Sequence, residues 1–182
     1  MSSNPQFRGS FGTHNVPKEP RNGRQRQVAV IGASGAEEGT ETWILAEEVG
    51  RGLAEAGVAL VCGGGGGVME AASRAAAEAG GTVIGIVPGE SVRDANPYCS
   101  HVVATGIGHG RNLAVVSSGE AVIAIGGEWG TLSEIGFARV IGHEVVALAS
   151  WEVDGRGRMA GGPGVVPAET AAEAVAAALV AL

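Results

Sequence analysis

The stretch AVIAIGGEWGTLSE, residues 121–134, carries in turn the signals of a buried strand, a glycine turn and a helix start. Its first five residues are all apolar, which is typical of a strand covered on both faces. Gly126 and Gly127 predict a tight turn, and a helical pattern follows up to Ile141. Because the first N–H groups of a helix lack partners and its dipole is positive there, this junction favours phosphate binding.

Side chains in the same stretch add polar groups to the predicted phosphate site. Thr131 places a hydroxyl at the helix start, and Glu134 follows one turn deeper on the same face. We therefore predict a phosphate-binding turn with a carboxylate beside it. Trp129 either stacks on the ligand or packs against the protein, and packing is the commoner role of tryptophan. The candidate ligand-binding residues of this stretch are Gly126, Gly127, Glu128, Trp129, Gly130, Thr131 and Glu134.

Apolar runs and helical patterns alternate along the chain from residue 27 onward. Residues 27–32 and 58–62 are two further apolar runs that lead into glycines and then into a helical pattern. Others cover residues 82–87, 101–105 and 144–149, and an alanine-rich helix is expected at 169–182. This order predicts an α/β fold, with a Rossmann-like, three-layer, doubly wound sheet that is mostly parallel and has six or seven strands.

The helix expected at residues 40–56 has Thr40 as its N-cap and Gly57 at its end. Its apolar stripe is predicted to be buried and consists of Trp43, Ile44, Ala46, Val49 and Leu53. Residues 150–164 are rich in glycine, which predicts irregular backbone before the terminal helix.

Four strand-to-helix turns, at residues 32–35, 63–67, 106–111 and 126–131, are expected to share one edge of the sheet. Right-handed crossovers place such turns at the carboxyl ends of parallel strands, where ligands bind. Glycine costs roughly 0.5–1 kcal/mol against alanine in ordered structure, so the five glycines at 63–67 suggest that side chains would block a ligand or another backbone. The candidate ligand-binding residues in these turns are Gly32, Ala33, Ser34, Gly64, Gly65, Gly66, Gly67, Val68, Met69, Arg111 and Asn112.

The length of 182 residues fits one nucleotide-binding domain, predicted at residues 27–182, after a polar and basic tail at residues 1–26 that is expected to be disordered. Five of the twelve basic residues lie in that tail, so residues 27–182 hold seven basic and eighteen acidic residues. Such an acidic body argues against binding to nucleic acid or to an anionic membrane. We therefore expect backbone amides and one or two arginines to hold any phosphate.

Composition also excludes several kinds of site. The only lysine is Lys18, in the tail, so neither a pyridoxal phosphate Schiff base nor a Walker-type phosphate loop is expected. The four histidines are scattered and none stands at a zinc-ligand spacing, so no metal site is predicted. Two cysteines are too few for a disulfide scaffold, and no apolar stretch reaches the length of a membrane span, so we expect a cytoplasmic protein that needs no cofactor.

Three segments together resemble the LOG (Lonely Guy) superfamily of Rossmann-like proteins. They are residues 63–72, the pair Arg111 and Asn112, and residues 126–134, within a likeness that runs from about residue 27 to 150. The chain looks most like the small bacterial branch that includes molybdenum-cofactor-carrier-like proteins. This resemblance implies binding of a small phosphorylated ligand such as AMP, or of a molybdopterin-type ligand, by a homodimer or larger homo-oligomer. Members were often labelled lysine decarboxylases, a chemistry that the lysine count makes implausible here.

Enzymes of the LOG superfamily cleave the N-glycosidic bond of cytokinin nucleoside 5′-monophosphates and release free base and ribose 5-phosphate. By this resemblance, Glu134 matches the glutamate of their motif, Arg111 the arginine, and His109 stands in the histidine place. The implied catalytic residues are Arg111 and Glu134. Glu134 would stabilise an oxocarbenium-like transition state or position water, while Arg111 would hold the phosphate or the departing base.

Three readings of the site therefore stand side by side. The first is a nucleotide-binding or carrier module without turnover, and the second is a nucleoside 5′-monophosphate phosphoribohydrolase. In the third, the chain is a purely structural oligomerisation domain. Glu134 would then cap its own helix start, and Arg111 would pair with an acid. The glycine turns favour the first two.

Overall fold

The computed structural model describes residues 23–153 and 165–182. The strands in these ranges are β1 (Gln27–Gly32), β2 (Ala59–Cys62), β3 (Val83–Val87), β4 (His101–Ala104), β5 (Ala121–Ile125), β6 (Glu144–Leu148) and β7 (Val165–Ala168). They form a single sheet in the order β4-β3-β2-β1-β5-β6-β7, and every neighbouring pair is parallel. The predicted α/β class and doubly wound sheet are confirmed.

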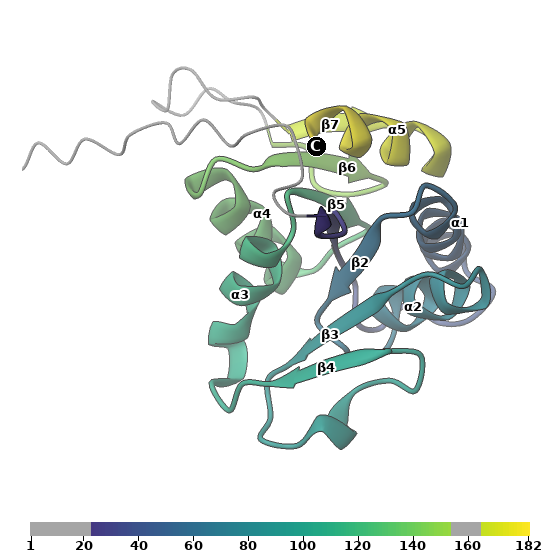
Figure 1. Cartoon of the computed structure of the whole chain (residues 1–182). Coiled ribbons are helices and arrows are strands. Elements are labelled where there is room, and N and C mark those ends of the chain that lie inside the picture. Colours follow the sequence, from purple (N-terminus) through teal and green to yellow (C-terminus); the bar gives the residue numbers. More distant parts are fainter. Residues whose placement is uncertain (1–22, 154–164) are drawn as a thin grey trace, which may run out of the picture.

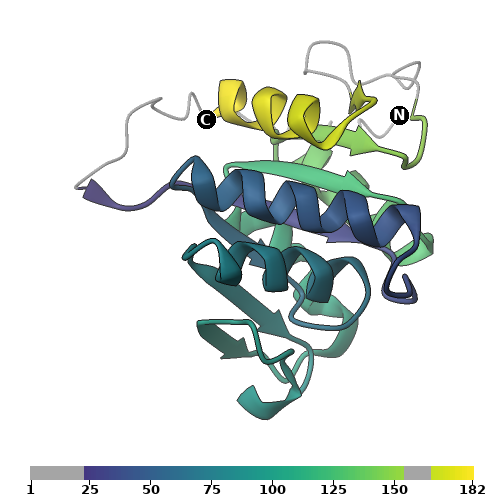
Figure 2. The same cartoon turned by 90° about the vertical axis from the view of Figure 1, so that its right-hand side faces the viewer.

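Helices cover both faces of this sheet and give the predicted three layers (Figures 1 and 2). They are α1 (Glu41–Glu55), α2 (Val68–Glu78), α3 (Arg111–Ser118), α4 (Trp129–Val140) and α5 (Ala171–Ala181), with short 3₁₀ turns η2 (Val92–Asp94) and η3 (Gly108–Gly110). The helices α1, α2 and α5 pack on one face, and α3 and α4 pack on the other. No helix in the described part of the chain is long and apolar enough to cross a membrane.

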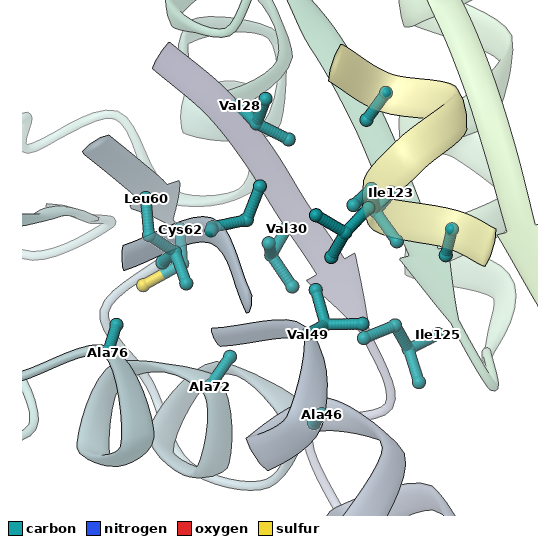
Figure 3. Packing of buried hydrophobic residues seen from close by; sticks show 14 of the residues in the cluster. Val28, Val30, Ala46, Val49, Leu60, Cys62, Ala72, Ala76, Ile123 and Ile125 are labelled. Carbon is teal, nitrogen blue, oxygen red and sulfur yellow. The ribbon is translucent and has the colours of Figure 1, made fainter. Parts of the chain in front are cut away.

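The central strands are apolar along almost all of their length because helices cover both faces of the sheet. Successive side chains of a strand point to opposite faces, so both sets must be apolar when both faces are packed. Val28 and Val30 of β1 therefore contact the core beneath α1 and α2, as Figure 3 shows. The alternate residues Ala29 and Ile31 belong to the core beneath α3 and α4.

Strand order reverses at β1, which lies between β2 and β5. Strands β1 to β4 are added one after another toward one edge of the sheet. The chain then crosses back through α3, and β5 pairs with the other side of β1. Gly32 pairs with Ile125, so β1 and β5 end level with each other. A side chain at Gly32 would run into the carbonyl oxygen of Ile125, and this explains glycine there. Ligands of open parallel sheets bind at such a reversal.

The structure corrects some details of the sequence reading. Ile44, predicted to be buried, is 46% exposed, because it lies about a quarter-turn away from the stripe that contains Trp43 and Ala46. Val165–Ala168 is a seventh strand for which the sequence offered no clear signal; Pro167 suits it because β7 is an edge strand, where a missing N–H is tolerated.

The predicted tail and glycine-rich segment lie largely outside the described residues, which omit 1–22 and 154–164. Within the tail as predicted, Gln25 donates a hydrogen bond to the carbonyl of Gly57 at 3.0 Å. Arg26 forms an ion pair with Glu120 at 3.4 Å. These two residues therefore contact the folded domain.

Candidate functional site

A cavity of about 230 Å³ opens at the carboxyl edge of the sheet, where the reversal of strand order lies. Its wall comes from the turn after β1, the turn after β2, the start of α3 and the start of α4. The lining residues are Val30, Ile31, Gly32, Ser34, Gly63, Met69, His109, Arg111, Asn112, Glu128, Gly130, Thr131 and Glu134. The four turns singled out in the sequence thus meet in one place.

The cavity brings together about half of the predicted site residues. Gly32, Ser34, Met69, Arg111, Asn112, Glu128, Gly130, Thr131 and Glu134 line it. Ala33, Gly64, Gly65, Gly66, Gly67, Val68, Gly126, Gly127 and Trp129 do not line it, although they stand in the same turns. Val68 is fully buried in the core. Whether any of these residues binds a ligand stays a prediction.

Arg111 and Glu134 face each other across this cavity. Nη1 of Arg111 lies 3.5 Å from Oε1 of Glu134, and the same nitrogen donates a hydrogen bond of 2.7 Å to Oδ1 of Asn112. The side chains of Arg111 and Glu134 are only 15% and 8% exposed. Nε of Arg111 is buried and has no hydrogen-bond partner among the described residues. The guanidinium therefore keeps donor capacity that an anionic ligand would use.

Glu134 is the titratable group of this cavity whose pKa is changed by its surroundings. Burial raises the pKa of its carboxyl from 4.5 to about 7, and the positive charge of Arg111 works in the opposite direction. Desolvation therefore outweighs an ion pair at 3.5 Å, because the separation is long and the carboxylate accepts no other hydrogen bond from the described residues. Near pH 7 the carboxyl is poised between its neutral and charged forms, as a general acid or base would be.

The five-glycine turn is explained in large part by the protein itself. A Cβ on Gly63 would lie 2.6 Å from the guanidinium of Arg111, so the missing side chain makes room for that cation. Gly67 has a φ of 62°, and a side chain there would meet the backbone of Ala33 and Ser34. The turn therefore needs glycine both for the close approach of another backbone and for the placement of the site's arginine.

The start of α4 is where the sequence predicted that phosphate would bind. Glu128 is its N-cap and forms a capping box with Thr131, whose hydroxyl accepts the N–H of Glu128 at 3.5 Å. Thr131 is buried and lines the cavity together with Gly130. The capping box engages part of the helix start, and the remaining first-turn N–H groups stay available to a ligand.

Trp129 differs from its sequence interpretation, which favoured packing. Its side chain is 78% exposed. Its ring lies 5.4 Å from that of Trp151, measured between centroids, with the two planes tilted by 36°. Glu128 and Gly130 on either side of it line the cavity, whereas Trp129 itself does not.

Sequence reasoning left four of the lining residues out of the predicted site. Two of them carry a signal in the sequence. Gly63 is the first residue of the glycine run, and His109 is the middle residue of a Gly-His-Gly segment that forms η3. Val30 and Ile31 carry no signal beyond that of a buried strand. The described residues hold no group of three or more His, Cys, Asp or Glu side chains that could bind a metal.

Comparisons with known proteins place the chain in a family and find solved structures with a similar fold. The model of the SLOG cluster4 family matches residues 25–175. An uncharacterized protein of Archaeoglobus fulgidus is 42% identical over 122 residues, which cover 67% of this chain and 79% of that protein. The solved molybdenum cofactor carrier protein of Chlamydomonas reinhardtii has 30% identity and a TM-score of 0.76, over 87% of this chain and all of its own.

One further relative carries an enzymatic name. It is the probable cytokinin riboside 5′-monophosphate phosphoribohydrolase LOGL5 of Oryza sativa subsp. japonica. It is 36% identical over 115 residues, which cover 62% of this chain and only 47% of the rice protein. The predicted likeness to LOG proteins and to molybdenum cofactor carriers is therefore confirmed at the level of sequence family and fold.

Proposed function

The chain belongs to the SLOG cluster4 family, and we propose that it binds a nucleotide or nucleotide-like phosphorylated ligand at the cavity between Arg111 and the start of α4. The proposed role is that of a binding or carrier protein. The observation that supports it most is the placement of Arg111, whose guanidinium lies in the space left by Gly63 and keeps an unpartnered Nε beside two helix starts. Backbone N–H groups and one arginine are sufficient to hold a phosphate.

The same site could bind the phosphate end of a molybdopterin-type ligand. The glycine turns and Arg111 would hold the phosphate, while the cavity of about 230 Å³ leaves the ring system to lie toward its open edge. A carrier needs to hold such a ligand without chemistry. The similarity to the Chlamydomonas carrier supports this choice among phosphorylated ligands.

The second candidate is hydrolysis of a nucleoside 5′-monophosphate to free base and ribose 5-phosphate. Two observations favour it: the rice relative, and a buried Glu134 whose pKa of about 7 suits a group that moves a proton or stabilises positive charge at the sugar. In that reaction the anomeric C–N bond breaks, water supplies the new C–O bond, and the base departs with a proton. Arg111 would hold the phosphate while Glu134 faces the sugar.

Identifying the small molecule that copurifies with the protein would decide between ligand classes. We expect native mass spectrometry to find a phosphorylated compound, and AMP-like ligands to raise the melting temperature. Incubation with a panel of nucleoside monophosphates, followed by chromatography, separates the two roles. Release of free base that disappears in Glu134→Gln favours the enzyme, whereas ligand binding without base release favours the carrier. No thermal shift with any phosphorylated ligand would contradict both.

We also propose that the protein is a cytoplasmic homodimer or larger homo-oligomer. Trp43 is buried and is not available for an interface. Phe137, Val140 and Ile141 are exposed apolar residues on or next to α4 and offer such a surface. Light scattering of the full chain measures the mass, and a monomer at micromolar concentration would refute this part.

A further inference from the structure

The two cysteines of the chain lie together beside the five-glycine turn. Cys62 ends β2 and pairs with Gly85 of β3. The two residues therefore lie side by side, with their side-chain positions on the same face of the sheet. Gly85 has no side chain, and Sγ of Cys99 fills the space above it, 2.7 Å from where a Cβ would be. The thiol of Cys99 therefore lies beside Cys62, close enough to influence its ionisation.

We propose that Cys62 and Cys99 are a redox-modification site, which a low-molecular-weight disulfide oxidises to a reversible disulfide within the chain. The pair is separate from the cavity, since neither cysteine lines it. The proposal therefore does not depend on which ligand the cavity binds.

The different burial of the two thiols sets the order of the steps. Cys62 is fully buried, whereas Cys99 is only partly buried and is the one that a small disulfide reaches. The neighbouring Cys62 and burial raise the pKa of Cys99. The Cys99 thiol therefore gives up its proton as it attacks one sulfur of the reagent RSSR, forms a Cys99–SR mixed disulfide and releases RSH. Cys62 then attacks the Cys99 sulfur and releases the second half of the reagent as RS⁻. Two cysteines lose two electrons, RSSR gains them, and the two thiol protons end on the two RSH products.

The surroundings of Cys62 support its role as the attacking sulfur of the second step. The neighbouring thiol of Cys99, together with the hydrogen bonds of Ser73 and of the Gly64 N–H, lowers the pKa of Cys62 to about 7 against the opposing effect of burial. The charge of Arg111 adds to this lowering. This lowering favours the thiolate, which is the form that attacks a disulfide.

Hydrogen bonds also connect both sulfurs to the glycine turn, that of Cys62 directly and that of Cys99 through Asn96. The N–H of Gly64 donates to Sγ of Cys62 at 3.4 Å. Asn96 donates from its backbone to the carbonyl of Gly64 at 2.8 Å and from Nδ2 to the carbonyl of Gly65 at 3.0 Å. Sγ of Cys99 donates in turn to Oδ1 of Asn96 at 3.5 Å. A disulfide would therefore fasten this loop to β2 at the turn that positions Arg111.

Intact-mass measurement of the reduced full-length protein during exposure to oxidised glutathione tests the proposal. We expect the wild type to lose two hydrogen atoms and both titratable thiols without keeping glutathione, and to recover them with dithiothreitol. The oxidised form should melt about 5–15 °C higher, as expected for a cross-link that closes a loop of this length.

Two single variants separate the roles of the cysteines. Cys62→Ser should accumulate a glutathione adduct at Cys99, because no second thiol resolves it. Cys99→Ser should stay unmodified, because Cys62 is buried. Circular dichroism controls for the fold of each variant. The proposal fails if the wild type keeps both thiols, if it accumulates glutathione adducts instead of the internal disulfide, or if non-reducing gels show that the disulfide joins two chains.

Discussion

Arg111 and Glu134 come from the starts of two different helices and meet 3.5 Å apart in one buried cavity. Because burial holds the pKa of Glu134 at about 7, this pair is not a fixed ion pair at neutral pH. When Glu134 is neutral, the charge of Arg111 is free to attract an anion. We therefore expect the protonation of this one carboxyl to control the affinity of the cavity for the proposed phosphorylated ligand.

Replacing Glu134 by Gln should make binding of AMP tighter at pH 8 and leave it nearly unchanged at pH 6. The variant lacks the negative charge that repels phosphate, while the wild-type carboxyl is itself mostly protonated below its pKa of about 7. We expect a gain of about three- to tenfold at pH 8, since a nearby charge in a half-buried site is worth on the order of 1 kcal/mol. Isothermal titration calorimetry at the two pH values measures it; equal affinities at pH 8 would refute the electrostatic account.

The same substitution should change how stability depends on pH. The pKa of Glu134 is higher in the folded protein than its ordinary 4.5, so the folded state keeps a proton that the unfolded chain releases. Its contribution is fully present below pH 4.5 and is lost as the pH rises to 7, by about 3 kcal/mol. In urea unfolding, Glu134→Gln should thus gain stability relative to the wild type across this range. Parallel curves for the two proteins would contradict the raised pKa.

Gly63→Ala should weaken binding of AMP by about tenfold, because the new Cβ would lie 2.6 Å from the guanidinium and must displace Arg111. The matched control is Gly136→Ala in α4, where a Cβ meets no atom within 4 Å. The control should bind AMP as the wild type does and be more stable by about 0.5–1 kcal/mol. Fluorescence titration of both variants checks this, and equal affinities for AMP would mean that Arg111 is not needed where it stands.

Trp129→Ala should reduce affinity for AMP without reducing affinity for ribose 5-phosphate. We propose that the exposed ring is a platform for a base, since Trp129 stands in the sequence between two residues that line the cavity. Stacking on an aromatic side chain is worth about 1–3 kcal/mol per base. Because the side chain is 78% exposed, its removal should change the melting temperature little. Competition binding of the two ligands measures the ratio. An equal loss for both would show that Trp129 supports the phosphate turn and does not contact a base.

Much of the fold was predictable because its signals are local. The apolar run at residues 121–125 and the glycines after it describe a buried parallel strand and its turn without any knowledge of neighbours. The seventh strand was not assigned, because Val165–Ala168 is short and contains a proline that only an edge position allows. Ile44 was placed in the core on its apolar character, although its position on the helix turns it away.

The sequence indicated many of the residues of the site, but it did not show which of them contact each other. That Arg111 would approach Gly63 and Glu134 depends on strand order, which carries α3 back across the sheet. The meeting of Cys62 with Cys99 depends likewise on the empty space at Gly85. Residues 1–26 were predicted as a tail, and the contacts of Arg26 with Glu120 arise only in the folded domain.

The central claim is that Arg111 holds the phosphate of a nucleotide-like ligand in the cavity between the glycine turns. Calorimetric titration of AMP into the wild type and into Arg111→Ala, with circular dichroism to verify the fold of the variant, tests it most directly. We predict saturable binding to the wild type with one AMP per chain, and binding at least about tenfold weaker in the variant, as expected for loss of a charge-assisted contact. Equal affinity of the two folded proteins, or no binding of AMP to the wild type, would contradict it.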